Sequence, residues 1–296
     1  MSYQHIPVML DEVIEYLKPR LGKKYIDCTL GGAGYTVALA KKIGSQGKVV
    51  GIDLDELAIR NAQALISEQK LSNIILINDN FKNLKTILSE KFPAGSKFDG
   101  IVFDLGLSSA QLDDEARGFS FKGDRPLDMS FGPANQSSTE EIVNRYPLLE
   151  LTRIFREYGE EKHAYRIAKA IVEARRAQRI KTTADLTAVI EKAIPFRYQS
   201  KIHPATRVFQ ALRMETNEEL ASLLEVLPVA VSFLKPLGCL VVVSFHSGED
   251  RIVKRFFKGE EGLKILTKRP LVPTEAETEN NPRARSAKLR AAEKIR

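Results

Sequence analysis

The chain of 296 residues contains no tryptophan, only two cysteines and only four histidines. Cys28 and Cys239 lie far apart and neither belongs to a CxxC pair, so the sequence indicates neither a disulfide framework nor a zinc site. No histidine or cysteine pair has metal-ligand spacing, and we therefore expect no catalytic metal.

Long apolar segments are also missing. No run approaches the roughly 20 residues that a membrane-spanning helix needs. The first residues, MSYQHIPVMLDEVIEYLKPR, lack the basic start and apolar stretch of a signal peptide. We therefore expect a cytoplasmic protein without membrane contact. The composition, 43% hydrophobic and 28% charged, is typical of a folded soluble chain with one large domain or a medium one carrying an insert.

Positive charge is unevenly distributed. The net charge is +7, and residues 145–213 hold 15 Lys or Arg against 7 Asp or Glu, which gives that segment a net +8. The tail from residue 277 to residue 296 adds a net +3. Such clustering is typical of a polyanion binder, although solvated helix faces explain it equally well on charge alone.

Apolar runs alternate with helical patterns through the first hundred residues. Near-continuous Val and Ile at 23–29, 48–54, 73–79 and 98–105 predict parallel strands buried on both faces. Residues 55–69 between two of them form an amphipathic helical pattern. This alternation predicts an α/β fold with a doubly wound sheet.

The pattern changes at about residue 113. Helix signals follow, including a capping box at Ser138 and Glu141 and helical stretches at 147–159, 160–178 and 182–194. After a helix at 218–234 the strand pattern returns at 238–245, and 263–269 and 287–295 supply the last two strands. We therefore predict a sheet domain at 1–112 and 209–296 with an all-helical insert at 113–208.

The stretch DCTLGGAGYT, residues 27–36, lies at the end of the first predicted strand. It fails the dinucleotide fingerprint GxGxxG, because from Gly31 the third position is Ala33 and the sixth is Thr36. No GxxxxGK[ST] motif is present either. A pyrophosphate ligand is therefore disfavoured, and a nicotinamide oxidoreductase is a remote alternative.

Carboxylates follow the other strands. Asp53 is placed to accept the hydroxyl protons of a ribose, Asp79 and Phe81 offer a polar group and a ring for a flat base, and Asp104 ends the fourth strand. A turn with few side chains beside these groups is typical of a binding site for S-adenosylmethionine, a nucleoside ligand without phosphates. We therefore predict this cofactor.

Longer motifs carry a resemblance to a known family. HIPVM, DCTLGGAGYT, FDLGLSSAQLD, RGFSF, PLDM, YGEEKHAYRIAKAI, ATRVFQALR, SFHSGEDRIVKRFF and NPRARSAKLR occur in this order between residues 5 and 290. They resemble the bacterial ribosomal RNA small-subunit methyltransferase H family. The resemblance implies a Rossmann-like, S-adenosylmethionine-dependent methyltransferase with an inserted helical domain, acting on N4 of a decoding-centre cytosine in 16S ribosomal RNA. The implied cofactor-binding residues are Gly31, Ala33, Gly34, Tyr35, Asp53, Phe81, Asp104 and Gln111.

This chain departs from the family pattern at four positions. The family usually has glycine at 33, histidine at 35, arginine at 130 and leucine at 248, where Ala33, Tyr35, Ser130 and Gly248 stand here. The first two affect cofactor contacts. Ser130 removes a cation near the expected substrate side, which leaves the grip on RNA and the exact target open.

The reaction needs an acceptor for a proton of the cytosine amine. We predict Asp104 in that role, with His246 as a second catalytic candidate whose structural role is equally plausible from the sequence. Whether Asp104 or water takes the final proton stays open. A base within folded RNA must also be unstacked, and the predicted substrate-binding residues are Asp128, Arg166, Lys169, Arg175 and Arg176.

The sequence is compatible with several functions. The expected partner is 16S ribosomal RNA within the small subunit or a late assembly intermediate, and a homodimer stays open. Alternatives are methylation of another RNA position, of a protein or of a small molecule. A non-catalytic ribosome-assembly factor that binds RNA is the alternative from another class. The four departures keep it open, whereas the presence of Asp53, Asp104 and Gln111 argues against it.

Overall fold

The computed structural model describes residues 7–107, 117–121, 123–132, 138–194 and 203–296. The chain forms two compact units, one of Met1–Ser109 with Leu220–Arg296 and one of Ala110–Glu219. The predicted border at 208 falls inside helix α10 (Pro204–Thr216), and the division lies at 219. Gln111 lies outside the described residues. Each unit is described by itself.

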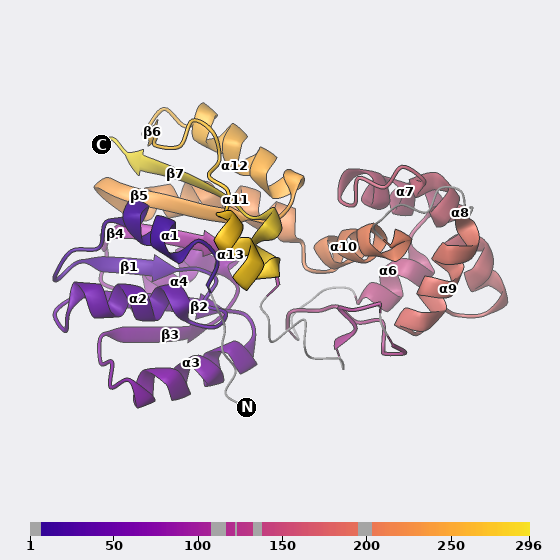
Figure 1. Ribbon diagram of the computed structural model, residues 1–296, viewed down its shortest axis with the longest axis horizontal. Coiled ribbons are helices and arrows are strands. Elements are labelled where there is room, and N and C mark those ends of the chain that lie inside the picture. Colours follow the sequence, from indigo (N-terminus) through magenta and orange to yellow (C-terminus); the bar gives the residue numbers. More distant parts are fainter. Residues whose placement is uncertain (1–6, 108–116, 122, 133–137, 195–202) are drawn as a thin grey trace. The chain divides into compact units, whose positions relative to one another are not determined.

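The first unit is built on a seven-stranded sheet with strand order β3-β2-β1-β4-β5-β7-β6 (Figure 1). Strands β1 to β5 pair in parallel, and β7 runs antiparallel to both of its neighbours. The strands are β1 (Lys24–Asp27), β2 (Lys48–Asp53), β3 (Ile74–Asn78), β4 (Phe98–Asp104), β5 (Leu234–Ser244), β6 (Leu263–Ile265) and β7 (Lys288–Lys294).

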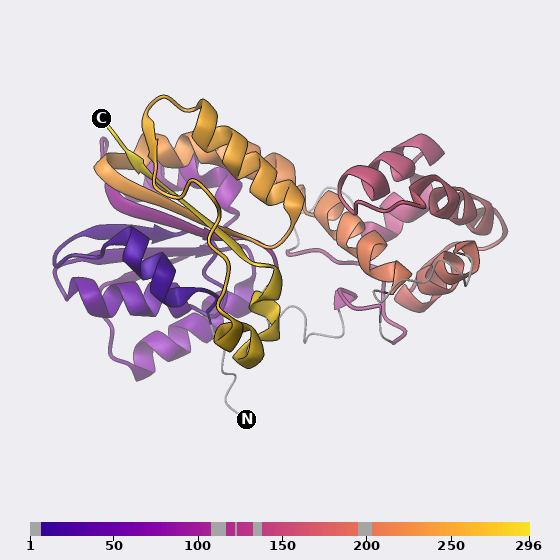
Figure 2. The same cartoon turned by 45° about the horizontal axis from the view of Figure 1, so that its top comes forward.

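Helices cover both faces of this sheet, because alternate strand residues point to opposite sides. Tyr25 packs in a core cluster with α1 and α2, whereas its neighbour Ile26 packs with α4, α11 and α12 (Figure 2). The helices of this unit are α1 (Leu10–Leu17), α2 (Gly34–Ile43), α3 (Glu56–Glu68), α4 (Leu84–Lys91), α11 (Glu219–Phe233), α12 (Ser247–Gly259) and α13 (Glu275–Asn280), with short 3-10 turns η1 (Phe81–Asn83) and η4 (Pro282–Ser286).

The predicted doubly wound sheet is confirmed, including its last two strands. One difference concerns β5, which begins at Leu234 rather than at 238. Leu234 pairs with Phe98 across a register shift before regular pairing resumes at Gly100 and Cys239. A pattern search for unbroken apolar runs misses this start, because Lys235, Pro236 and Gly238 interrupt the run.

The second unit is helical among its described residues, which contain only an isolated bridge between Pro126 and Thr182. Its helices are α6 (Thr139–Arg145), α7 (Leu148–Glu157), α8 (Ala164–Ala177), α9 (Thr183–Ala193) and α10. Helix α8 begins at Ala164 rather than at 160, because Glu160 adopts a left-handed φ of 48°. Helix α10 was not predicted, although Pro204 at its first turn is a typical start signal. Within the described ranges, no helix combines the length and the apolar character needed to cross a membrane.

Candidate functional site

The carboxyl ends of the parallel strands meet at one edge of the sheet, where open α/β sheets bind ligands. Asp53 ends β2, Asp104 ends β4, and His246 follows β5 closely. Asp104 pairs in register with Val243, so the ends of β4 and β5 are neighbours. The fold therefore brings these three predicted residues to the same edge.

The glycine turn connects β1 to α2 and is anchored by Asp53. The Gly31 amide donates to Oδ2 of Asp53 at 2.8 Å, and the Asp55 amide donates to Oδ1 at 2.8 Å. Gly31 and Ala33 have φ values of 47° and 62° in the left-handed region. An alanine there carries a cost of about 1 kcal/mol that glycine avoids. This conformation accounts for the family's usual glycine at position 33.

Gly34 lacks a side chain for a different reason. A Cβ at this position would lie 2.7 Å from side-chain atoms of Pro7, which is too close for two carbon atoms. The turn is therefore bare partly because the chain itself packs against it. Within this turn, the backbone conformation itself favours glycine at positions 31 and 33.

Asp27, at the end of β1, is fully buried at the same edge. Its Oδ2 accepts from the Thr36 hydroxyl at 2.8 Å and its Oδ1 accepts from the Thr29 amide at 3.2 Å. Burial raises the pKa of Asp27 to about 6 against these hydrogen bonds, and the charge of Asp53 adds to the rise. Asp27 was not predicted as a site residue, although its place at the end of a predicted strand was the available signal.

Asp104 is half-buried as a residue, whereas its neighbour Asp27 is fully buried. Oδ1 of Asp104 is inaccessible to solvent and has no hydrogen-bond partner among the described residues. Burial raises the pKa of Asp104 well above its usual range, and the negative charges of Asp27 and Glu249 raise it further, whereas the nearby Tyr35 hydroxyl lowers it. Without a ligand, Asp104 therefore holds a proton more readily than an ordinary aspartate does.

Tyr35, which replaces the family's histidine, packs into the core at 3% exposure. Its hydroxyl donates to the carbonyl of Val8 and lies beside the Asp104 carboxyl group. Burial and the charge of Asp104 raise the pKa of Tyr35 well above its usual range. The neutral Tyr35 phenol thus lies between the Val8 carbonyl and the Asp104 carboxyl group. A charged histidine at this position would interact differently with the Asp104 carboxylate.

Phe81 and Asp79 follow β3 as predicted. The Phe81 ring packs edge-to-face on Phe103, with 5.7 Å between the ring centroids. Oδ1 of Asp79 accepts from the Asn80 amide at 2.7 Å and from Nδ2 of Asn83 at 2.8 Å. Phe103 thus holds the Phe81 ring in place, and the turn holds Asp79. Their contact with the adenine base of a cofactor stays a prediction.

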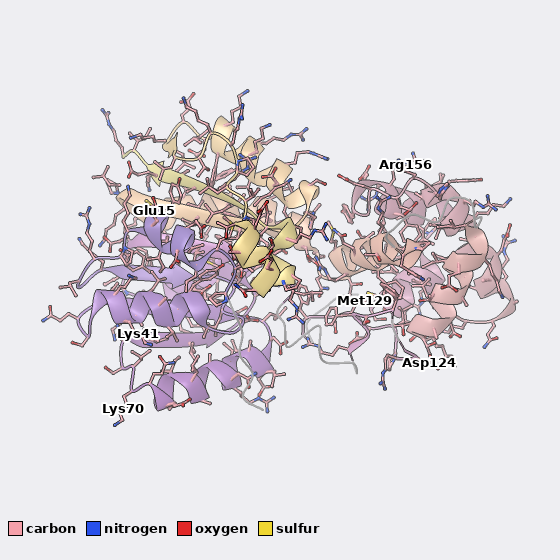
Figure 3. The ribbon with its side chains drawn as sticks, in the orientation of Figure 1. Glu15, Lys41, Lys70, Asp124, Met129 and Arg156 are labelled. Atoms are coloured by element: carbon pink, nitrogen blue, oxygen red, sulfur yellow. The ribbon has the colours of Figure 1, made fainter. Side chains whose placement is uncertain are left out.

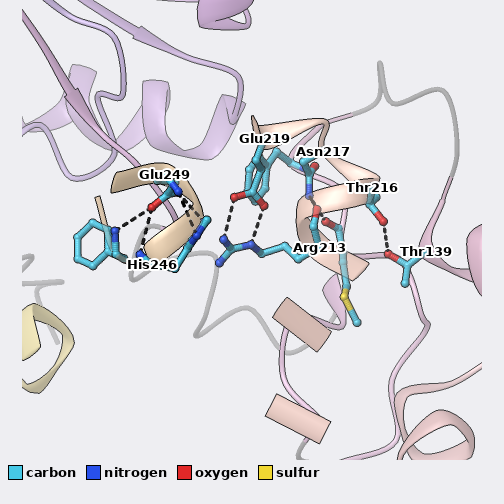
Figure 4. A network of polar contacts seen from close by, with 10 residues as sticks. Thr139, Arg213, Thr216, Asn217, Glu219, His246 and Glu249 are labelled. Atoms are coloured by element: carbon cyan, nitrogen blue, oxygen red, sulfur yellow. Dashed lines mark hydrogen bonds and ion pairs between the residues drawn. The ribbon is translucent and has the colours of Figure 1, made fainter. Parts of the chain in front are cut away.

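His246 has a clear structural role. It is the N-cap of α12, and its Nδ1 accepts from the Glu249 amide at 3.3 Å, while Glu249 Oε2 accepts from the Phe245 amide at 2.8 Å (Figure 4). Nε2 lies 3.1 Å from Oε1 of Glu249 but makes no hydrogen bond within the described residues. Its catalytic role stays a prediction.

Gly248 leaves the His246 ring undisturbed. A Cβ at this position would lie 3.1 Å from Nδ1 and 3.2 Å from Cε1 of the imidazole, and 3.6 Å from Leu220. The usual leucine would therefore press on the ring that caps α12. Glu249, which the sequence analysis missed, completes a capping box with histidine in the place of serine.

In the second unit, Asp128 lies on a tightly held loop. Its carbonyl accepts from the Thr139 hydroxyl at 2.7 Å, and its Oδ2 accepts from the Ser130 hydroxyl at 2.9 Å. Asn217 Nδ2 donates to the Met129 carbonyl at 2.8 Å, and Met129 has a left-handed φ of 53° (Figures 3 and 4). The Ser130 hydroxyl thus orients the Asp128 carboxylate. A long arginine side chain at position 130 would not make this hydroxyl hydrogen bond.

Gly118 makes this loop possible, and its replacement by alanine should disrupt it. Gly118 has a φ of +68°, and a Cβ there would lie 2.2 Å from the Pro126 carbonyl oxygen. Gly118→Ala should lower the free energy of unfolding by about 2 to 3 kcal/mol, as measured by denaturant unfolding. Gly123→Ala is the matched control, because it has a φ of +95° but only Arg125 Nε within 4 Å, at 3.8 Å. Equal losses in both variants would contradict this explanation.

The predicted substrate-binding cations divide into two groups. Arg175 donates to the Val143 and Tyr146 carbonyls at 2.7 and 2.8 Å, so its guanidinium binds backbone near the end of α6. Burial lowers the pKa of Arg175. Lys169 lies 3.8 Å from Glu173, whereas Arg166 and Arg176 are exposed and form no ion pair among the described residues. Arg175 therefore has a mainly structural role. Arg166 and Arg176 are the cations of this set that fit the predicted contact with RNA best.

S-adenosylmethionine fits the first unit's strand edge. Asp104 Oδ1 is an enclosed acceptor without a partner, and Asp27 and Glu249 add negative charge around it. Such a cluster favours a ligand that carries positive charge, and the cofactor has a sulfonium and an ammonium group. Asp53 lies beside the Gly31 turn where a ribose acid is needed. Asp53, Asp104 and the Gly31 turn are the groups that would hold it.

Comparison with known proteins gives the family. Residues 2–295 match the MraW methylase family. The ribosomal RNA small subunit methyltransferase H of Carboxydothermus hydrogenoformans is 44% identical over 314 residues, covering 100% of this chain and 99% of that protein. The protein of the same name from Heliobacterium mobile is 43% identical over 314 residues, covering both chains fully. A solved rRNA methylase from Streptococcus thermophilus gives a TM-score of 0.46 at 12% identity, over 100% of this chain and 99% of that one. On the sequence matches alone, this chain belongs to the MraW methylase family.

Proposed function

We propose that the protein transfers a methyl group from S-adenosylmethionine to N4 of a cytosine in small-subunit ribosomal RNA. The observation that carries the chemistry is the enclosed, unpartnered Oδ1 of Asp104 at the sheet edge where the cofactor fits. Full-length relatives named ribosomal RNA small subunit methyltransferase H support the substrate. The enzyme acts in the cytoplasm, on the small subunit or a late assembly intermediate.

The chain's own residues position and deprotonate the amine. Cytosine N4 is a poor nucleophile, because its lone pair is delocalised into the ring. S-adenosylmethionine supplies, when bound, an electrophilic methyl group on a sulfonium sulfur. Asp104 accepts one amine hydrogen, which returns electron density to N4, and holding the amine in line supplies several kcal/mol, roughly 7 in well-oriented systems. After transfer, the cationic nitrogen loses a proton to Asp104 or to water.

The cofactor's positive charge prepares Asp104 for this task. In the ligand-free protein, burial and the neighbouring carboxylates raise the pKa of Asp104 and favour its protonated form. A cation beside it favours the ionised form instead. A bound methyl donor would therefore favour the ionised form of Asp104, which can accept a proton.

Cofactor affinity should rise with pH between about 5 and 7. The pKa of Asp27 is about 6 in the ligand-free protein, and a cationic ligand favours the ionised carboxylate. Affinity should fall by about tenfold from pH 7 to pH 5, because protons must leave on binding. Calorimetry in buffers of different ionisation enthalpy measures both the affinity and the protons released. Asp27→Asn should flatten this profile, and a wild-type affinity that does not vary with pH would refute the coupling.

The RNA is recognised in part by the second unit. Arg166 and Arg176 are exposed on α8, and Asp128 is held on its loop by Thr139 and Ser130. The cations track the phosphate backbone, and Asp128 serves as a polar contact for the substrate. Splayed-out bases in RNA are read by such polar groups, while phosphates position the strand.

Methyl transfer to isolated subunits tests the function. Small ribosomal subunits that lack the modification are incubated with the protein and labelled S-adenosylmethionine, and their nucleosides are separated by mass spectrometry. We expect label in N4-methylcytidine. Label in another nucleoside would overturn the target, and absence of label with the cofactor bound would favour a non-catalytic assembly role.

A further inference from the structure

Helix α12 carries a cationic stripe on its exposed face. Arg251, Lys254, Arg255 and Lys258 are all exposed and follow the i, i+3, i+4, i+7 spacing of one helix face. Glu249, Val253 and Phe257 form the buried face, and the two apolar residues pack in a core cluster with residues of β4, β5 and α11. The stripe therefore points away from the first unit's core.

The cations at the centre of the stripe are not neutralised by acidic side chains. Among the described residues, Lys254, Arg255 and Lys258 form no ion pair. The two acids of α12 are used elsewhere: Glu249 is buried in the cap, and Asp250 Oδ1 accepts from Arg290 Nε at 2.6 Å. Like charges three or four residues apart destabilise a helix. The helix dipole explains Lys258 in the last turn but not Lys254 and Arg255 in the middle.

The insert's cations differ in this respect. Arg153 pairs with Glu150 at 2.6 Å, Arg179 pairs with Glu140 at 2.6 Å, and Arg175 donates to backbone carbonyls. The net +8 of residues 145–213 already subtracts Glu150 but leaves out Glu140 and other acids of the same unit. Over the whole second unit, residues 110–219, 18 Lys or Arg stand against 17 Asp or Glu, so the net charge is only +1 and the +8 overstates what the unit offers to a polyanion.

The stripe also begins at the candidate site. Helix α12 starts directly after His246, at the edge where β5 ends beside Asp104. Arg251 lies about one turn from that start, and the stripe then extends for roughly 10 Å along the helix. RNA phosphates flanking a base bound at this edge come within reach of it.

We propose that the α12 stripe, centred on Lys254, Arg255 and Lys258, is a phosphate-binding surface for the RNA substrate. This inference rests on the proposed function and adds a contact surface within the methyltransferase unit itself. The chemistry is charge complementarity to an RNA backbone without base readout. It therefore contributes to affinity and its salt dependence rather than to the choice of base.

Salt-dependent RNA binding tests the stripe. The variant is Lys254→Gln/Arg255→Gln/Lys258→Gln, and the probe is fluorescent small-subunit RNA titrated from 50 to 200 mM salt. Three lost phosphate contacts reduce the log–log slope by about 2 to 3 units. The wild type should therefore lose about 20- to 40-fold more affinity than the variant over this range. An unchanged slope overturns the inference.

Two controls separate the stripe from general effects of charge and fold. Lys41→Gln/Lys42→Gln/Lys91→Gln removes the same charge from the ends of α2 and α4, which lead into β2 and β4 at the opposite edge (Figure 3). This variant should keep the wild-type slope. Lys254→Arg/Arg255→Lys/Lys258→Arg preserves charge and should also keep it. Affinity for S-adenosylmethionine should be equal in all variants.

Failure of the proposed function is distinguishable from failure of the stripe. Methyl transfer by the wild type to modification-free subunits reports on the function alone. Wild-type transfer with an unchanged slope in the stripe variant overturns only the stripe. A reduced slope without wild-type transfer supports the stripe while overturning the reaction.

Discussion

Asp104→Asn is expected to lower kcat for methyl transfer by about 100- to 1000-fold at saturating cofactor. The asparagine keeps the size of the side chain but cannot become an anion. In the proposed mechanism, Asp104 Oδ1, which is inaccessible to solvent and has no hydrogen-bond partner among the described residues, accepts from the substrate amine. Single-turnover transfer to modification-free small subunits measures this step without product release. Normal turnover with intact cofactor binding would contradict the assignment.

The control for this variant lies on the same strand. Asp99→Asn changes an acid near the start of β4, where Asp99 pairs with Lys235 at 2.8 Å. This variant should lose about 1 kcal/mol of stability, because the half-buried Asp99 carboxylate loses its charge beside Lys235, and should keep its rate. The comparison separates a loss of strand stability from a loss of chemistry.

Stability should change in the opposite direction from activity. Because the folded pKa of Asp104 is raised, its contribution to stability is fully present below the unfolded pKa of about 4 and is lost as pH rises through the folded value. Asparagine has no such loss. The cofactor-free variant should therefore melt at a higher temperature than the wild type at pH 8, with a smaller difference at pH 4. A lower melting temperature at pH 8 would argue against the buried anion.

Asp53→Ala is expected to weaken S-adenosylmethionine binding by about 100-fold. Two hydrogen bonds from ribose hydroxyls to a carboxylate account for about 3 kcal/mol of this loss. The variant also removes the acceptor of the Gly31 and Asp55 amides, which loosens the turn that faces the cofactor. Isothermal titration measures the affinity, and kcat at saturation should fall much less than the affinity.

Asp55→Ala is the matched control, two residues away. Asp55 caps α3 by accepting from the Leu57 amide at 3.0 Å, and its loss should cost about 1 kcal/mol of stability. Its affinity for the cofactor should stay within a few-fold of the wild type. Equal losses of affinity in the two variants would show that the local fold, rather than a ribose contact, determines binding.

Local sequence patterns determined most of the first unit. Near-continuous Val and Ile are typical of strands buried on both faces, and the parallel sheet follows from their alternation with helices. Asp53 and Asp104 could be placed at strand ends because a strand's end is visible in the sequence. The family was recognisable for the same reason, since its motifs are contiguous stretches.

The burial, hydrogen bonding and pKa of those residues were decided by tertiary structure alone. The pKa of Asp104 is raised by burial and by the charges of Asp27 and Glu249 and is lowered by Tyr35, and these three residues come from other elements. Arg175 was predicted to contact RNA, but it binds the backbone carbonyls of Val143 and Tyr146.

The glycine turn divides in the same way. Local backbone conformation favours glycine at positions 31 and 33, although Ala33 stands at the second, whereas Gly34 is bare because Pro7 packs against it. A sequence pattern encodes periodicity and local conformation, which depend on neighbours along the chain. Burial, charge pairing and pKa depend on neighbours in space, and these exist only once the chain is folded.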